Sequence, residues 1–156
     1  MITIGIDLGT QSVKTLILKD YKIEGYSKAF AGFDPTKAAE EAVQEALKNS
    51  NLTLADVTNF TATGSGMELS PYSPGKVSMM SADAKAATYI FPDARTIVDV
   101  GAEEARAIKC DDRGLMVDFV VNERCAAGAG AFIEAMARAL EVKMEDMGPL
   151  ALKAEK

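Results

Sequence analysis

The 156-residue chain contains no histidine and only two cysteines, Cys110 and Cys125. The absence of histidine excludes zinc sites built on histidine ligands and hydrolytic triads that use histidine as the base. Two cysteines are too few for a disulfide framework, so a reducing compartment is the simpler interpretation. Chemistry that depends on histidine or on several disulfides is therefore excluded.

The sequence also has no cluster of basic residues, no long apolar run and no signal peptide. Lys and Arg number 17 against 23 Asp and Glu, a net charge of -6, so a nucleic acid is not an expected partner. Charged and turn-forming residues interrupt the first 20 positions, and no membrane segment is predicted. The expected location is the cytoplasm. With 48% apolar residues, the chain can form a core in one domain or two small lobes.

The first part of the chain has the predicted order strand, strand, strand, helix, strand. Apolar or alternating runs predict strands over residues 1–9, 12–20, 22–33 and 57–64. Asp34 and Pro35 predict a helix start, with Asp34 as N-cap and Pro35 in the first helical position. An apolar stripe with helical spacing follows, formed by Ala39, Ala42, Val43, Ala46 and Leu47. The Gly-, Ser- and Pro-rich stretch 64–76 predicts a loop.

After a predicted helix over residues 79–91, the same order begins again. Strands are predicted over residues 95–102, 104–112 and 115–122, and another helix follows. Its apolar face comprises Ala129, Phe132, Ile133, Met136, Ala137 and Leu140. The repeat predicts two lobes, residues 1–65 and 66–156, and the second lacks the strand that closes the first.

Each unit opens with the pattern Asp-x-Gly at the tip of its first strand. The copies are Asp7-Leu8-Gly9 and Asp99-Val100-Gly101. A single copy is more simply explained as turn chemistry, but two copies at matching places favour a functional pair. Glycine lets backbone N–H groups approach phosphate oxygens, Thr10 and Ser12 add hydroxyl donors, and aspartates can hold hydrated magnesium. Two such tips facing one cleft would suit the phosphates of a nucleotide.

Several segments resemble one protein family. "GIDLGTQSVK" and "DVGAEEAR" resemble the two phosphate motifs of the actin, sugar kinase and Hsp70 superfamily. Within it, "NERCAAGAGAFIEAMARALEV" is similar to the Cys-Ala-Ala-Gly-x-Gly-x-Phe segment of the ATPase-activator family of 2-hydroxyacyl-CoA dehydratases and benzoyl-CoA reductases. "TATGSGMELS" and the stretch 78–108 also fit, while "DPTKAAEEAVQEAL" and "DDRG" resemble the D-type ATPase subunit of benzoyl-CoA reductase.

The resemblance covers essentially the whole chain. It implies an α/β fold of the ribonuclease H-like (actin-like ATPase) type, with two lobes of mixed sheet plus helices and an incomplete second lobe.

The resemblance implies an ATP-hydrolysing, iron–sulfur electron-transfer subunit. It implies catalytic roles for Asp7, Asp99 and Glu103, with Asp7 and Asp99 also holding Mg²⁺ through water. The residues implied in ATP binding are Gly9, Thr10, Gln11, Ser12, Lys14, Gly101 and Ala102. The implied partners are a homologous ATPase subunit or a second copy, the catalytic reductase or dehydratase subunits, and ferredoxin.

In the family, the cysteine at the position of Cys125 is implied to ligate a 4Fe-4S cluster shared between two subunits. The local chemistry agrees, because a thiolate at a helix N-terminus is stabilised by the helix dipole, Arg124 adds positive charge, and the neighbouring residues are small. The alternative is a partly buried, inert cysteine among helix-packing residues. A cluster needs four thiolates, and Cys110 is interpreted as a packing residue on the same strand face as Ile108.

Three positions leave their roles open. Glu103 stands where relatives often have glutamine, and it either orients the attacking water or is a surface carboxylate beside Glu104. Lys14 either reaches a phosphate, the favoured interpretation, or points to solvent from its strand. Asp83 stands where relatives tend to have histidine, and the sequence offers no physical account of it.

The family's second cysteine, its adenine-binding glycine motif and the last strands of its second lobe are expected beyond the end of this chain. The sequence is therefore predicted to be an N-terminal fragment or one piece of a split protein. Two other functions stay open. A small-molecule kinase of the same superfamily would leave Cys125 without a cluster, and a non-catalytic interaction module would use the unfinished edge of the second sheet.

Overall fold

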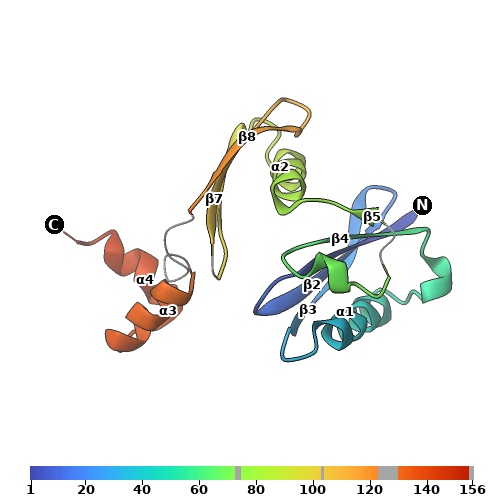
Figure 1. Cartoon of the computed structure of the whole chain (residues 1–156), viewed down its shortest axis with the longest axis horizontal. Helices are drawn as coiled ribbons and strands as arrows, with labels where there is room; N and C mark the ends of the chain where they lie inside the picture. Colours follow the sequence, from blue (N-terminus) through green and yellow to red (C-terminus); the bar gives the residue numbers. More distant parts are fainter. Residues whose placement is uncertain (73–74, 103, 123–129, 155–156) are drawn as a thin grey trace. The chain divides into compact units, whose positions relative to one another are not determined.

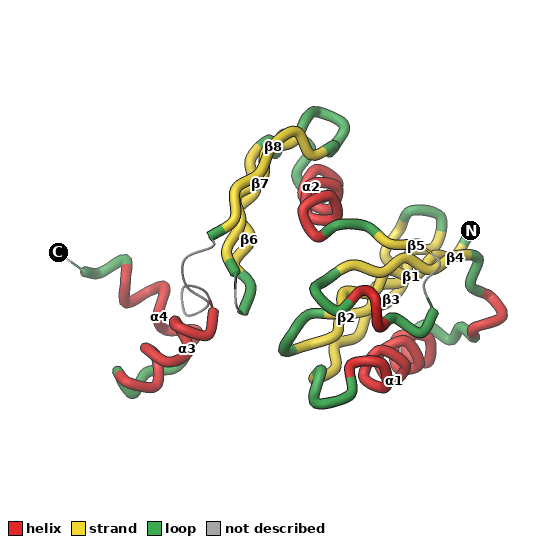
Figure 2. Tube along the Cα trace, viewed as in Figure 1, coloured by secondary structure: helices red, strands yellow, loops and turns green. Residues whose placement is uncertain are grey.

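The computed structural model describes residues 1–72, 75–102, 104–122 and 130–154. The chain divides into two compact units, Met1–Ala86 and Ala87–Lys156 (Figure 1). The division falls within helix α2, which spans Met79–Ile90. Each unit contains its own sheet (Figure 2). The lobe boundary after residue 65 stays a prediction.

The first unit is built on a five-stranded mixed sheet in the order β3-β2-β1-β4-β5. The strands are β1 (Ile2–Leu8), β2 (Ser12–Lys19), β3 (Lys22–Phe30), β4 (Asn59–Thr63) and β5 (Gly75–Lys76). The first three form an antiparallel meander, whereas β4 pairs with β1 and β5 pairs with β4 in parallel. Alternation along β1 buries Ile4, Ile6 and Leu8 on the face that forms the core.

Helix α1 (Pro35–Asn49) lies against this core face, as Figure 1 shows. The Asp34 carboxylate accepts a hydrogen bond from the Lys37 N–H at 3.0 Å, and Pro35 occupies the start of the helix. The predicted cap and the predicted stripe are therefore confirmed. The buried side chains of the helix are Ala38, Ala39, Ala42, Val43, Ala46 and Leu47.

We expect Asp34→Ala to lower the free energy of unfolding of the first unit by about 1 kcal/mol, because the Lys37 N–H loses its acceptor. Urea denaturation followed by far-UV circular dichroism measures the change. The control is Glu40→Ala, which removes an exposed carboxylate from the same helix and should change stability by less than about 0.5 kcal/mol. Equal effects of the two substitutions would contradict the capping role.

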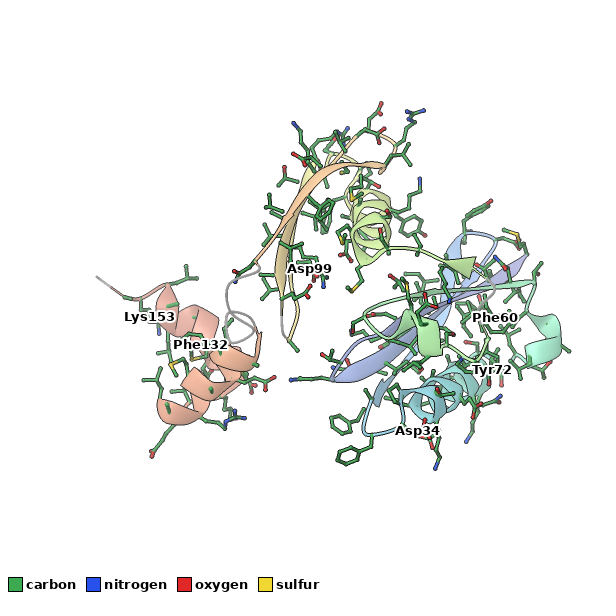
Figure 3. The ribbon with its side chains drawn as sticks, viewed as in Figure 1. Asp34, Phe60, Tyr72, Asp99, Phe132 and Lys153 are labelled. Carbon is green, nitrogen blue, oxygen red and sulfur yellow. The ribbon has the colours of Figure 1, made fainter. Side chains whose placement is uncertain are left out.

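Two described parts of the predicted loop 64–76 form regular structure. They are a 3₁₀ turn at Met67–Leu69 and the two-residue strand β5, so the loop prediction is wrong over Gly75–Lys76. The Tyr72 ring stacks on Phe60 of β4, with centroids 5.2 Å apart and planes at 17° (Figure 3). Elements of two or three residues are too short for hydrophobic periodicity to reveal, and stacking between distant residues leaves no local signal.

The second unit contains a three-stranded antiparallel sheet in the order β6-β7-β8, followed by two helices. The elements are β6 (Thr96–Val100), β7 (Ala105–Cys110), β8 (Met116–Val121), α3 (Gly130–Ala139) and α4 (Met144–Ala151). The three strands and α3 confirm the predicted order. Helix α4 was not predicted, because it is short and contains Gly148 and Pro149, two residues that normally mark turns.

The two faces of this sheet differ in exposure. Alternation along β7 buries Arg106, Ile108 and Cys110, and the Cys110 Sγ lies 3.5 Å from the Ala94 carbonyl oxygen. Cys110 is therefore a packing residue, as predicted. The opposite face carries exposed valines on the outer strands, at positions Val98, Val100 and Val120.

The predicted apolar face of α3 is only partly covered. Ala137 is buried, whereas Phe132 and Leu140 are 50% and 63% exposed, and Ala129 lies outside the described residues. In the described ranges, no helix combines the length and apolar composition needed to cross a membrane.

Candidate functional site

The two predicted Asp-x-Gly motifs form turns with the same internal hydrogen bond. In the first turn, the Gly9 N–H donates to the Ser12 carbonyl oxygen at 3.1 Å. In the second, the Gly101 N–H donates to the Glu104 carbonyl oxygen at 2.8 Å. Each turn connects the first strand of its sheet to an antiparallel neighbour. The repeat found in the sequence is thus also a repeat of backbone geometry.

Each aspartate forms an ion pair with a cation directly across its hairpin. Asp7 and Lys14 are register partners, and Lys14 Nζ lies 2.8 Å from Asp7 Oδ2. Asp99 and Arg106 are register partners as well, and Arg106 Nη1 lies 2.8 Å from Asp99 Oδ2. In both hairpins the cation follows the aspartate by 7 residues. Lys14 therefore contacts Asp7, a contact that the sequence analysis did not consider.

Neighbouring segments support the first turn. Thr63 is the β4 register partner of Asp7, and its hydroxyl is buried without a hydrogen-bond partner in the described parts of the chain. The Gly66 N–H donates to the Leu8 carbonyl oxygen at 2.9 Å. Thr10 and Gln11 remain exposed at the tip of the turn, and Ser12 is half-buried.

Helix α3 begins against the second turn. The Gly130 N–H donates to the Gly101 carbonyl oxygen at 2.8 Å, and the Ala131 N–H donates to the Ala102 carbonyl oxygen at 3.2 Å. A methyl group on Gly130 would lie 3.2 Å from the Gly101 oxygen, so its small size permits this close approach. Figure 3 labels Asp99 on β6 and Phe132 on α3. The turn and the helix are thus joined by backbone hydrogen bonds.

The structure describes only some of the remaining predicted site residues. Glu103 and Cys125 lie outside the described residues. Asp83 is half-buried on α2. Three residues beside the turns were not singled out from the sequence, namely Thr63, Gly64 and Arg106. Strand register brings Thr63 and Arg106 beside the aspartates. The equal spacing of seven residues from aspartate to cation in both hairpins is a sequence signal that could have identified Arg106.

Carboxylates and hydroxyls at both turns are oxygen donors of the kind that magnesium prefers. Asp7 has its Oδ2 atom paired with Lys14, and the buried Thr63 hydroxyl beside it lacks a partner among the described residues. The donor set therefore fits a hydrated hard cation. In the described parts of the chain, no three or more Cys, Asp or Glu side chains are grouped to hold a metal ion by themselves.

Residues 4–156 match the sequence profile of the BadF/BadG/BcrA/BcrD ATPase family. This chain belongs to that family. The match includes both turns, helix α3 and the segment that contains Cys125. Membership confirms the resemblance on which the sequence analysis relied.

Three relatives of this family member are informative. It is 37% identical over 150 residues to the activator of lactoyl-CoA dehydratase from Anaerotignum propionicum, covering 96% of this chain and 58% of the relative. It is 35% identical over 162 residues to the D-type subunit of benzoyl-CoA reductase from Thauera aromatica, covering 99% and 56%. The activator of the 2-hydroxyisocaproyl-CoA dehydratase from Clostridium difficile, solved with bound ADPNP, superposes with a TM-score of 0.87 at 28% identity, covering 100% and 58%.

The structural match identifies the fold as the α/β, ribonuclease H-like (actin-like ATPase) type that the sequence predicts. The chain spans 56% to 58% of the length of these three relatives.

Proposed function

We propose that this chain is the phosphate-binding part of an ATPase that drives low-potential electrons into a benzoyl-CoA reductase or a 2-hydroxyacyl-CoA dehydratase. One observation carries the proposal. In a chain of an ATPase family, each of two Asp-x-Gly turns has the same internal hydrogen bond and its own ion pair across the hairpin. The bound ADPNP of the Clostridium difficile relative supports ATP as the ligand.

The two turns contact the phosphates of ATP through backbone N–H groups and short side chains, which can approach phosphate oxygens closely. The residues that we assign to this contact are Gly9, Thr10, Gln11, Ser12, Lys14, Gly101 and Ala102. Lys14 pairs with Asp7 across the hairpin. Its flexible stem allows it to turn toward a phosphate.

Asp7 and Asp99 hold a magnesium ion through water. Bound magnesium offsets negative charge on the transferred phosphoryl group. The Thr63 hydroxyl, which has no partner among the described residues, can donate a hydrogen bond beside Asp7. Glu103 orients the attacking water, a role that a carboxylate can perform. Its neighbour Glu104 is engaged with Arg106 at 2.8 Å and is therefore less available for that role.

Cys125 supplies one thiolate to a 4Fe-4S cluster shared between two subunits. Such a cluster transfers electrons, at a potential set by its ligands and their surroundings. Because Gly130 and Ala131 are hydrogen-bonded to Gly101 and Ala102, a shift of the second turn during hydrolysis is passed to α3. Helix α3 follows the cysteine segment directly in the chain, so the same shift reaches the surroundings of Cys125.

The partners follow from this role. A homologous ATPase subunit or a second copy contributes further thiolates, because the cluster requires four and Cys125 supplies one. Ferredoxin delivers the electron, and a catalytic reductase or dehydratase subunit receives it and acts on the acyl-CoA. The exposed Phe132 on α3 and Leu140 directly after it provide apolar surface for a contact between subunits next to the cysteine segment.

The proposal is tested by neutralising each aspartate in the purified protein. We expect Asp7→Asn and Asp99→Asn each to lower the rate of magnesium-dependent ATP hydrolysis by about 100-fold or more, because charge stabilisation at the phosphoryl group is lost. Asp112→Asn, in the exposed turn between β7 and β8, is the control and should leave the rate unchanged. Unchanged hydrolysis in both variants would overturn the proposed function.

A second candidate function is a non-catalytic interaction module. The exposed Val98, Val100 and Val120 on one face of the second sheet favour it, since such faces bind partners. A wild-type protein that binds no ADPNP but assembles with a reductase or dehydratase subunit would support this candidate instead.

A further inference from the structure

Arg106 is a buried cation that joins two carboxylates. Its side chain is 8% exposed. Nη1 donates to Asp99 Oδ2 and Nη2 donates to Glu104 Oε2, each at 2.8 Å. The two acceptors remain partly open to solvent, at 34% and 50% exposure. The guanidinium therefore faces the interior while its carboxylate partners face the outside.

This placement is costly for a purely structural residue. Arg106 shares its sheet face with Ile108 and Cys110, both fully or nearly fully buried. Burying a charge on an apolar face requires compensating partners, and an apolar side chain of similar size often stabilises such a position equally well. A role beyond strand packing accounts better for a positive charge at this point.

We propose that Arg106 is a positioning residue that sets the charge of the second turn so that magnesium binds there more tightly together with nucleotide phosphates than alone. The inference rests on the proposed function. Among the described residues of this cluster, Asp99 and Glu104 contribute two negative charges and Arg106 one positive charge, a sum of -1. The guanidinium repels a bare divalent cation, and it attracts phosphate oxygens that arrive with one.

The first turn lacks this arrangement. Lys14 is 53% exposed, and among the described residues the ion pair of its single ammonium group is with Asp7. Solvent screens such a pair strongly, and a lysine head cannot donate in a fixed fork to two carboxylates. We therefore assign the control of charge around the metal to the second turn and not to the first.

The test compares binding of a metal alone with binding of a nucleotide. In Arg106→Met, the affinity for Mn²⁺ without nucleotide, measured by electron paramagnetic resonance, should rise about tenfold, because a positive charge near a divalent ion is removed. The affinity for ADPNP in excess Mg²⁺, measured by calorimetry, should fall about tenfold, because the positive charge that attracts phosphate oxygens is removed. A merely structural role would weaken both affinities or leave both unchanged.

Three further variants complete the test. Glu104→Gln removes one negative charge and leaves the Arg106 pair with Asp99, so Mn²⁺ affinity should fall. Arg106→Gln, which removes the same positive charge but keeps polar groups for hydrogen bonds, serves if Arg106→Met does not fold. Arg113→Met removes an exposed positive charge at the far end of β7 and should change neither affinity.

The outcomes separate the two proposals. If Asp7→Asn and Asp99→Asn both leave hydrolysis unchanged, the proposed function is wrong. If Asp99→Asn weakens ADPNP binding but Arg106→Met moves both affinities the same way or neither, only the role of Arg106 is wrong.

Discussion

Gly64→Ala is expected to lower the rate of ATP hydrolysis by about 100-fold and the free energy of unfolding of the first unit by roughly 2–5 kcal/mol. Gly64 has a φ of +94°, which residues with a side chain rarely adopt. A methyl group there would lie 2.4 Å from the Leu8 carbonyl oxygen and 2.6 Å from Asp7 Oδ1. Both atoms belong to the first turn, so the substitution would displace the carboxylate that we assign to magnesium.

The matched control is Gly32→Ala. Gly32 also has a positive φ of +59°, but the nearest atom to an added methyl group is Phe30 Cδ1 at 3.9 Å, an ordinary contact. We expect it to cost about 1 kcal/mol of stability from backbone strain and to retain hydrolysis. Urea denaturation and hydrolysis rates per folded molecule measure the two effects. Should Gly64→Ala not fold, Gly66→Ala provides a milder displacement, with its methyl group 3.2 Å from the Leu8 oxygen. Equal hydrolysis in the variants and the control would show that this loop does not position the first turn.

Cys125→Ala is expected to reduce the iron content of anaerobically reconstituted protein to background. Each ligand thiolate of a 4Fe-4S cluster binds one iron, and a methyl group provides no donor. In a subunit-bridging cluster, loss of one ligand from each chain would also separate the subunits. Iron and acid-labile sulfide analysis measures the loss, together with the brown absorbance of the cluster and the mass of the assembly in solution.

The chain offers its own control for this experiment. Cys110→Ala removes the other cysteine, which is 3% exposed and packed on β7 near Ala94. It should cost about 1 kcal/mol of stability through lost packing, with iron content unchanged. Protein that binds iron equally well with Cys125→Ala would rule out the cluster assignment and would favour the kinase alternative.

Most elements of the fold followed from local pattern. The apolar run of β1, the capping pair Asp34–Pro35 and the helical stripe of α1 each depend on residues close together in the chain, and each is confirmed. Helix α4 and strand β5 were missed because one is interrupted by Gly148 and Pro149 and the other has two residues. Local pattern fails where an element is short or is stabilised mainly by its neighbours.

The candidate site shows the same limit. The repeated Asp-x-Gly pattern was recognisable in the sequence. No sequence pattern indicated that the Thr63 hydroxyl lies beside Asp7 or that the N-terminus of α3 contacts Gly101. The small size of Gly130 permits a close contact with the second turn, and no local pattern in the sequence indicates that contact. These contacts join residues that are distant in the chain.

The sequence by itself determined the order of the strands and helices other than β5 and α4, the repeat of the two aspartate turns and the family of this protein, because each is encoded in runs of neighbouring residues. Only the tertiary structure decided which groups surround those turns. Strand register sets Lys14 against Asp7 and Arg106 against Asp99, and helix packing joins α3 to the second turn. Register and packing arise from many long-range contacts acting together, so no single stretch of sequence specifies them.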